Sequence, residues 1–462
     1  MPIFLKRERS FYKNLAALAL PLVLQNLVNS SLSLADTVMV GMLGQNELAG
    51  VSLANTPFFV AMLFVFGLQS GGAVLISQYW GKKDVVTVNR VMGVSIYFAG
   101  ALSFLFATLM TLFPEPVMRM VTNNPDLIDI SVRYAKYVAY SYFINSVTMV
   151  YVGTQRSTEN PKFGMYVVTI SMVANVFLNW VLIFGKFGFP ALGVEGAAIA
   201  TLISRIIELV ITIIYILFFD KHLKIIPKAI LAPGKEILKD FLKYSTPVIM
   251  NETLWGLGIS LLPVVYGHMA NSADVVAGNS IAGNVERIVT VFVFAIANAS
   301  AIIIGKEIGR GAGKDEVQRL GGDLLGIASA VGAVSGIVLA ISTVIAIEPY
   351  IFPLFDLSDE ARRIAKMMLL SMSFILFARS FNATNIVGIL RGGGDVRVCM
   401  LLDVLPLYLY TVPLAAVTAL LLNWDIQWVY FIILSEDILK FIFGFKRYKS
   451  RRWINNITRD FA

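Results

Sequence analysis

Long uninterrupted runs of apolar residues dominate the pattern of this 462-residue chain. Residues 91–114, 163–185 and 324–347 contain no Asp, Glu, Lys or Arg. A helix needs about 20 mostly apolar residues to cross a bilayer, so each run is long enough to do so. The pattern predicts twelve membrane-spanning helices, at about 15–40, 50–76, 91–113, 131–153, 163–185, 193–219, 241–268, 276–304, 324–347, 365–389, 398–422 and 426–445.

Composition supports a membrane protein. The chain is 57% hydrophobic and 15% charged, with a mean hydropathy of +0.73, whereas soluble proteins carry about a quarter charged residues. The one cysteine, Cys399, excludes an internal disulfide. The apolar stretch after the basic N-terminus is too long for a signal-peptide core. We therefore expect an all-α integral membrane protein of twelve helices.

The distribution of basic residues predicts the topology. With the N-terminus inside, 28 of the 38 Lys and Arg residues fall in inside segments, seven fall outside, and Arg205, Arg287 and Arg379 lie within spans. This split follows the positive-inside rule. We expect a multi-pass protein of the plasma membrane, the bacterial inner membrane, with both termini cytoplasmic. The basic tail FKRYKSRRW is interpreted as an anchor at anionic lipid, and no nucleic-acid partner is expected.

The two halves of the chain share one design. Setting Pro21 on Pro247 also sets Gly41 on Gly267, and further on Gly81 matches Gly309 and Gly153 matches Gly388. Six spans return the chain to its starting side, so the halves have one orientation. Repeat-built transporters bind substrate between halves and rock one against the other. The predicted organisation is an N-terminal tail (1–14), an N-lobe (15–219), a connector (220–240), a C-lobe (241–445) and a basic C-terminal tail (446–462).

Two carboxylates within the spans are the leading candidates for function. Asp36 lies in the first span and Glu252 in the seventh. A charge at a helix centre costs about 2.5–3.5 kcal/mol on insertion scales and normally faces a cavity or a partner. Under the repeat, Asp36 falls on Leu262 and Glu252 on Asn26, an asymmetry that scaffolding alone does not require.

Oxygen-bearing side chains elsewhere could complete a cation site. Asn175 and Asn179 are four residues apart and share one helix face, and Thr201 could add a hydroxyl. Asn pairs also serve as hydrogen bonds between helices, and spacing alone does not decide between the two roles. A buried carboxylate suits proton coupling, and with neighbouring oxygens it could instead hold sodium.

Other charges within the spans have structural or coupling roles as alternatives. Arg205 and Glu208 are three residues apart and can pair, whereas Glu286 and Arg287 point apart. Arg379 has Glu252 or Asp403 as possible partners. Asp403 lies near Pro406 in the eleventh span and is a second C-lobe candidate for binding a cation or substrate. A separate set, Glu436, Asp437 and Lys440, is interpreted as interfacial.

Four segments together are typical of one transporter family: LALPLVLQNLVNSSLSLADTVMVGMLGQNELAGVSLAN, LISQYWGKKD, GVEGAAIATLISRIIE and GILRGGGDVRVCMLLD. They resemble the multidrug and toxic compound extrusion (MATE) family, and the resemblance runs from about residue 12 to 455. It implies twelve helices in two pseudo-symmetric six-helix lobes. It also implies export of cationic, often aromatic compounds in exchange for Na⁺ or H⁺.

The resemblance implies site residues as well. The family's N-lobe ion site matches Asp36, Asn175, Asn179 and Thr201, with Asn179 at a position that is Asp in other branches. The NorM-like branch has an acid on its seventh helix, which Glu252 matches. That branch also tends to carry an acid on the tenth helix, where this chain has none and Asp403 stands in on the eleventh.

Three other functions are weighed against antiport. A flippase for a lipid-linked or amphipathic substrate would favour a basic cavity for pyrophosphate, whereas the acids here favour cations. A channel needs a sustained polar stripe. An enzyme needs a nucleophile or metal constellation, and no HExxH or GxSxG occurs. We expect a multidrug antiporter that functions as a monomer and is not an enzyme, with no cofactor and no metal beyond bound Na⁺.

Overall fold

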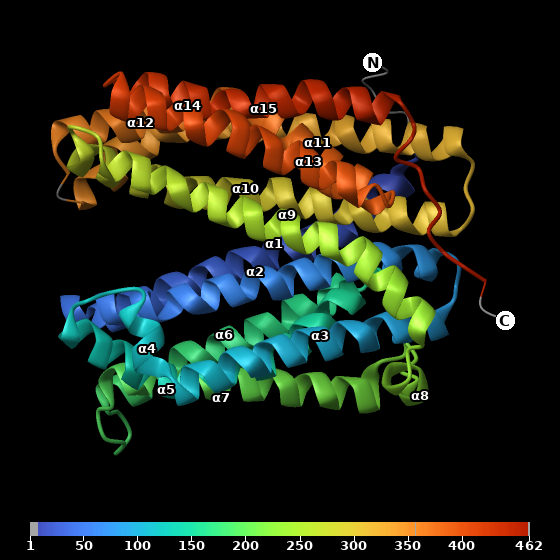
Figure 1. Ribbon diagram of the computed structural model, residues 1–462, viewed down its shortest axis with the longest axis horizontal. Helices are drawn as coiled ribbons and strands as arrows, with labels where there is room; N and C mark the ends of the chain where they lie inside the picture. Colours follow the sequence, from blue (N-terminus) through green and yellow to red (C-terminus); the bar gives the residue numbers. More distant parts are fainter. Residues whose placement is uncertain (1–7, 356, 461–462) are drawn as a thin grey trace. The chain divides into compact units, whose positions relative to one another are not determined.

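The computed structural model describes residues 8–355 and 357–460, and the regular secondary structure of this part of the chain is helical, with no β-strand. It divides into two compact units, each described separately below. One unit is Pro21–Ile249, and the other joins the residues up to Leu20 with those from Met250 onward. We call these the N-lobe and the C-lobe. Within each lobe the long helices run side by side (Figure 1).

Twelve long helical segments correspond to the twelve predicted spans. In the N-lobe half they are α1 (Arg9–Gly41), α2 (Gln45–Gly81), α3 (Val85–Leu112), α5 (Pro125–Ser157), α6 (Pro161–Phe184) and α7 (Gly193–Ile214), which continues as the π-helical turn η1 (Tyr215–Phe219). Two short helices, α4 (Pro114–Arg119) and α8 (Pro227–Leu231), lie in connections.

The second half follows the same plan with more π-helical turns. Its segments are α9 (Lys235–Gly267), α10 (Ser272–Gly309), α11 (Lys314–Ser342) with η2 (Thr343–Ile351) and the 3₁₀ turn η3 (Phe352–Leu354), α12 (Asp359–Ala383) with η4 (Thr384–Leu390), then α13 (Val396–Pro406), η5 (Leu407–Thr411), α14 (Val412–Ala416) and η6 (Val417–Leu421) in one run, and α15 (Ile426–Lys449).

Ten helices of the described chain are long and apolar enough to cross a membrane. The two long helices outside that set, α5 and α15, carry charges within their length, such as Arg133 and Lys136 in α5 and Glu436 in α15. Many large apolar side chains face outward on the spans, including Phe104, Phe177 and Val338. A lipid environment accounts for such exposure, whereas a soluble monomer rarely shows so much.

The repeat is visible in how the helices pack. In the N-lobe α5 packs against α2, α3 and α7, and α6 packs against α7. In the C-lobe α12 packs against α10, α11 and α15, and α13 packs against α15. These are the same pairs in order along each half, so the two lobes are built on one packing plan.

Two tight turns repeat in detail. The alignment that sets Gly81 on Gly309 also sets Lys83 on Gly311, and both have positive φ, 64° and 84°. The alignment of Gly153 with Gly388 likewise sets Glu159 (φ 68°) on Gly394 (φ 83°). Glycine takes this conformation readily and other residues do so at a cost, so the second half has the easier residue at both turns.

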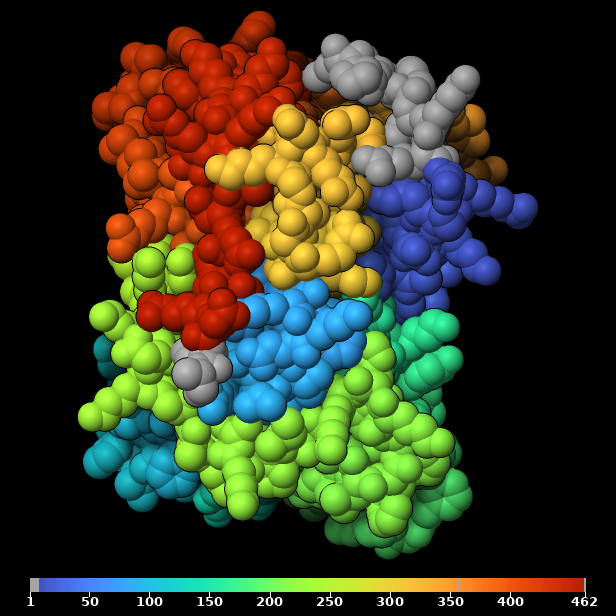
Figure 2. Space-filling model, turned by 90° about the vertical axis from the view of Figure 1, so that its right-hand side faces the viewer, coloured from blue at the N-terminus to red at the C-terminus, as the bar shows by residue number. Residues whose placement is uncertain are grey.

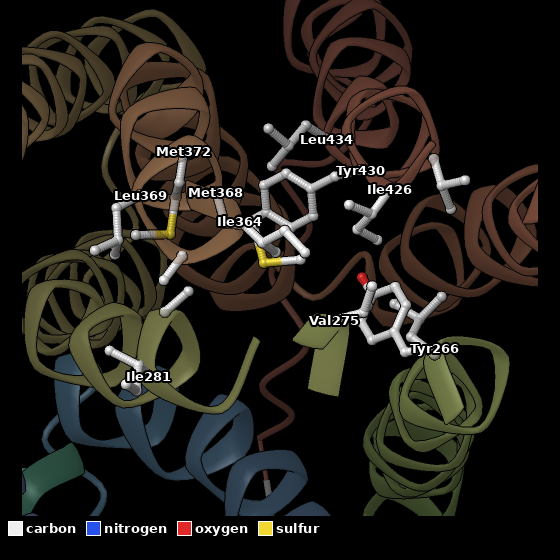
Figure 3. Packing of buried hydrophobic residues seen from close by; sticks show 14 of the residues in the cluster. Tyr266, Val275, Ile281, Ile364, Met368, Leu369, Met372, Ile426, Tyr430 and Leu434 are labelled. Carbon is white, nitrogen blue, oxygen red and sulfur yellow. The ribbon is translucent and has the colours of Figure 1, made fainter. Parts of the chain in front are cut away.

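The C-lobe core is apolar and centred on α12. Met368 and Leu369 are fully buried, and they belong to one apolar cluster with Tyr266 of α9 and Tyr430 of α15 (Figure 3). The first turns of α1 belong to this lobe, because Leu15 and Leu18 lie in a second C-lobe cluster with Ile304 of α10. The N-lobe has its own core, in which Phe58 stacks on Tyr142 with ring centroids 3.9 Å apart.

Some predicted boundaries differ from the structure. The predicted tail 1–14 lies partly outside the described residues, and the chain is helical from Arg9. The predicted connector 220–240 contains α8, and α9 starts at Lys235. The lobe boundaries fall inside α1 and α9, so a long helix rather than the connector carries the chain from one compact unit to the other.

The C-terminal segment is a folded strap. Trp453 is fully buried and donates from Nε1 to the Tyr448 carbonyl oxygen at 3.0 Å. Arg447 pairs with Asp395 at 2.6 Å, and Arg451 pairs with Asp315 at 2.6 Å. Figure 2 shows this segment, in red, beside the yellow end of α10 and α11. These two arginines of the tail thus have acidic partners within the C-lobe, and the anchoring of the tail at anionic lipid stays a prediction.

Candidate functional site

The fifth long helix, α6, presents two amides from one face. Its first residue is Pro161, which suits a helix start because no N–H is needed there. It ends at Gly185, whose φ of 66° is the left-handed cap conformation. Asn175 and Asn179 lie within the helix, only 3% and 1% exposed. Their side chains join, with Asn179 Nδ2 donating to Asn175 Oδ1 at 2.9 Å.

A close contact between α6 and α7 brings in Thr201. A Cβ on Gly196 would stand 2.6 Å from the Leu182 carbonyl oxygen, so only glycine permits this approach. One turn further on, Asn175 Nδ2 donates to Thr201 Oγ1 at 3.5 Å. The hydroxyl of Tyr134, on α5, is within hydrogen-bonding reach of the same threonine.

Asp36 of α1 completes the group. Asn179 Nδ2 donates to Asp36 Oδ1 at 2.5 Å. The Asn179 Oδ1 atom is buried and has no hydrogen-bond partner in the described chain. Because the amide nitrogen faces a carboxylate, which accepts hydrogen bonds, the oxygen is the atom left over. The structure thus brings together all four residues predicted for the N-lobe site, which we call the Asp36 cluster: Asp36, Asn175, Asn179 and Thr201.

The charge balance around Asp36 leaves one carboxylate in excess. Arg205 is near enough to influence Asp36 electrostatically. Its guanidinium is paired with Glu208, however, with Nη1 and Oε2 2.5 Å apart as the three-residue spacing predicts. It also donates to Asn145 at 3.4 Å. The cluster therefore has an amide oxygen without a partner, on Asn179, a hydroxyl oxygen, on Thr201, and one excess negative charge. This combination suits the binding of a proton or a hard monovalent cation.

The predicted C-lobe candidate Glu252 has a basic partner. Arg391 Nη1 lies 2.6 Å from Glu252 Oε1, and the two side chains are 4% and 15% exposed. Arg391 was counted among the basic residues of the inside segments, and it lies directly after η4, at the end of the α12–η4 run. Of the possible partners named for Arg379, Glu252 and Asp403, neither forms the ion pairs that the structure shows for it.

Arg379 instead joins two other acids. It forms ion pairs with Glu286 of α10 and with Asp437 of α15, the second at 3.0 Å. Asn382, one turn along α12, donates to Asp437 Oδ1 at 3.1 Å. Arg287, adjacent to Glu286, is exposed on the other face of α10.

Asp403 of α13 belongs to a separate group with residues of α15. Lys440 Nζ lies 3.2 Å from Asp403 Oδ1 and 2.7 Å from Glu436 Oε1. Asp437 is next along the chain, and all three α15 residues are less than 10% exposed. The interpretation of Glu436, Asp437 and Lys440 as interfacial is therefore wrong. The four-residue spacing of Glu436 and Lys440 was the sequence signal for this pair.

No group of three or more His, Cys, Asp or Glu residues that could hold a metal ion occurs in the described chain. The Asp36 cluster could still hold Na⁺, because its oxygens come mainly from amide and hydroxyl groups. Its residues come from three helices of a single lobe, α1, α6 and α7, so it does not depend on the other lobe.

Comparisons with known proteins agree with this architecture. The MatE family model matches residues 21–181 and again 247–417. The two matches begin at Pro21 and Pro247, the prolines that the repeat aligns, which confirms the duplication.

Relatives match over nearly the whole chain. The probable multidrug resistance protein YoeA of Bacillus subtilis is 26% identical over 465 residues, covering 98% of this chain and 97% of the relative. The probable multidrug resistance protein NorM of Thermotoga maritima is 25% identical over 411 residues, covering 88% and 85%.

Solved structures show the same fold. A MOP superfamily transporter from Pyrococcus furiosus superposes with a TM-score of 0.83 at 22% identity, covering 95% of each chain. A variant of the Vibrio cholerae MATE transporter VcmN superposes with a TM-score of 0.84 at 18% identity, covering 96% and 97%. With a MatE match in each half and this two-lobe helical fold, the chain belongs to the MatE family of membrane transporters.

Proposed function

We propose that the protein exports cationic, amphipathic organic compounds in exchange for a monovalent cation bound at the Asp36 cluster. The observation that carries the proposal is the pairing of Asp36 with Asn179, whose buried Oδ1 atom has no partner. A site with one surplus carboxylate and one unsatisfied acceptor gains from a bound proton or Na⁺. Relatives named as multidrug resistance proteins support the substrate class.

The driving force is electrical and chemical. One cation moving inward gains about 2.3 kcal/mol per 100 mV of membrane potential, and its concentration gradient adds to this. We propose that the protein lies in the plasma membrane with both termini cytoplasmic, which the basic inside segments support. Alternating access would come from motion of the two lobes, each of which has its own core.

The buried charges disfavour the flippase alternative. The C-lobe groups described above contain five acids (Glu252, Glu286, Asp403, Glu436 and Asp437) and three bases (Arg379, Arg391 and Lys440). A pyrophosphate carrier needs the opposite excess. The Pyrococcus furiosus transporter is described as having a binding pocket of reversed polarity that suggests a different function, so the sign of buried charge bears on the substrate.

The test is uphill efflux of ethidium from proteoliposomes under separately imposed Na⁺ and H⁺ gradients. Asp36→Asn should abolish uphill export under whichever gradient drives the wild type. Asp129→Asn is the matched control, because Asp129 pairs with Arg133 at the surface and its side chain is 71% exposed. Uphill export by Asp36→Asn at the wild-type rate would refute the proposal, as would equal export in the absence of both gradients.

A further inference from the structure

A lysine ammonium already lies where the C-lobe could hold a free cation. Lys440 Nζ contacts one oxygen of Asp403 and one of Glu436. The side chains of the three residues are 9%, 16% and 11% exposed. A lone buried lysine is costly, and two buried carboxylates repel each other, so each part of this group needs the others.

The remaining oxygens of the two acids have neutral donors. Asn251 of α9 donates to Asp403 Oδ2 at 3.2 Å, and Thr411 of η5 donates to Glu436 Oε2 at 2.7 Å. Among the four carboxylate oxygens of this group, the two that contact the ammonium are thus the ones to which no neutral side chain of the described residues donates. Asn251 is 2% exposed, and its Oδ1 atom has no partner in the described chain.

This arrangement is a ligand set for a hard monovalent cation. One oxygen of Asp403 and one of Glu436 contact the Lys440 ammonium. Asn251, which donates to Asp403, also carries an amide oxygen with no partner in the described chain. Hard cations prefer such oxygen ligands. Because the acids outnumber Lys440 two to one, the group keeps a net negative charge, and Asp437 adds to the field that stabilises the lysine cation.

The repeat relates this group to the Asp36 cluster. Extending the alignment of Gly153 with Gly388 without a gap sets Thr201 on Glu436 and Arg205 on Lys440. In both lobes the fifth helical run donates to that position of the sixth, through Asn175 to Thr201 and through Thr411 to Glu436.

The basic residue behaves differently in the two lobes. Arg205 pairs with Glu208 on its own helix, whereas Lys440 reaches across to Asp403 of α13 as well as to Glu436. The N-lobe group therefore leaves Asp36 open to an external cation, whereas the C-lobe group holds a tethered cation between Asp403 and Glu436.

We infer that Asp403, Glu436 and Asn251 form a second monovalent-cation site, and that the Lys440 ammonium is its permanent occupant in place of Na⁺. The comparison with the N-lobe rests on the proposed function, but the C-lobe site stands on its own contacts. It follows that this C-lobe group takes no external coupling ion while Lys440 is present.

The experiment measures the melting temperature of purified protein in NaCl and in choline chloride at equal ionic strength. All variants carry Asp36→Asn, so failure of the proposed function cannot affect the result. With Lys440 intact, Na⁺ should have no specific effect. With Lys440→Gln added, Na⁺ at about ten times its dissociation constant should raise the melting temperature by about 2–5 °C. Adding Asp403→Asn should remove that rise, and Lys440→Arg should show none.

Two results would overturn the inference. One is a Na⁺-specific rise while Lys440 is present, because the site would then accept an ion beside the lysine. The other is the absence of any rise in folded Lys440→Gln protein. Where that change alone prevents folding, Lys440→Gln with Glu436→Gln removes the repulsion and leaves Asp403 and Asn251 to bind Na⁺. For this double variant too, the absence of any Na⁺-specific rise in melting temperature in folded protein would overturn the inference. The same holds for such a rise in its matched control, Glu436→Gln with Lys440 intact.

Discussion

Replacing Glu252 by glutamine separates a structural role from a transport role. The change leaves the Arg391 guanidinium, whose side chain is 4% exposed, without the carboxylate that lies 2.6 Å away. Removing one partner of a buried ion pair costs about 3–5 kcal/mol. We expect a loss in the free energy of unfolding of about 3 kcal/mol, at the lower end of this range. The glutamine oxygen can still accept a hydrogen bond, and Asp403 is close enough to stabilise the Arg391 cation.

The assay is a double-mutant cycle read by thermal unfolding in detergent. For units of this size, a loss of about 3 kcal/mol lowers the melting temperature by about 6–12 °C. Glu252→Gln combined with Arg391→Gln removes both charges and should recover much of that loss. Glu115→Gln is the control, because its pair with Arg119 is on the surface and should contribute less than about 1 kcal/mol.

The outcome that refutes this reasoning is specific. The variant Glu252→Gln could have the wild-type melting temperature and yet lose ion-driven export. In that case the carboxylate binds a transported cation, and its pairing with Arg391 does not stabilise the lobe. Loss of stability with transport retained per folded molecule would establish the structural role.

Three further changes test the fold. Gly393→Ala places a Cβ 2.4 Å from the Trp453 carbonyl oxygen, so the strap should detach and trypsin should cleave after Arg452 at least tenfold faster; unchanged cleavage would contradict this packing. Met368→Ala empties a fully buried position in the C-lobe core and should cost about 2–5 kcal/mol, and a loss within error of zero in thermal unfolding would show that the site is not close-packed. Ser358→Ala removes the cap of α12, where Ser358 Oγ accepts from a backbone N–H at 3.0 Å, and should cost about 1 kcal/mol, measured the same way; an unchanged melting temperature would show that the cap contributes nothing.

The architecture could be predicted from the sequence, because it depends on the length and charge of the apolar runs and on the repeat. Run length and charge located the helices, and matching glycines and prolines located the repeat. The π-helical turns in the second half, such as η4 and η5, had no signal in hydropathy. The boundaries of the compact units inside α1 and α9 also could not be predicted, because a continuous apolar helix shows no break where it passes from one core to the next.

The Asp36 cluster was predictable for two reasons. The four-residue spacing placed Asn175 and Asn179 on one face, and the family resemblance linked them to Asp36 and Thr201. Tyr134 was missed because an aromatic residue in a span normally reads as packing.

The C-lobe partners were harder to predict, since ion pairs between helices depend on rotations that hydropathy does not encode. Arg391 was counted among the basic residues of an inside segment, and Lys440 was placed near a membrane surface. The repeat does contain a signal for Lys440. The alignment that sets Thr201 on Glu436 also sets Arg205 on Lys440, so both halves carry a basic residue at the same position of their sixth span.

The central claim is that a coupling cation binds at the Asp36 cluster and exchanges with substrate. Its most direct test is substrate-driven ion movement in proteoliposomes, with pyranine reporting H⁺ and a fluorescent Na⁺ indicator reporting Na⁺. An imposed ethidium gradient should drive one of these ions the opposite way in the wild type, and Asp36→Asn should abolish that movement. Substrate-driven movement of the same ion, undiminished in Asp36→Asn, would contradict the account.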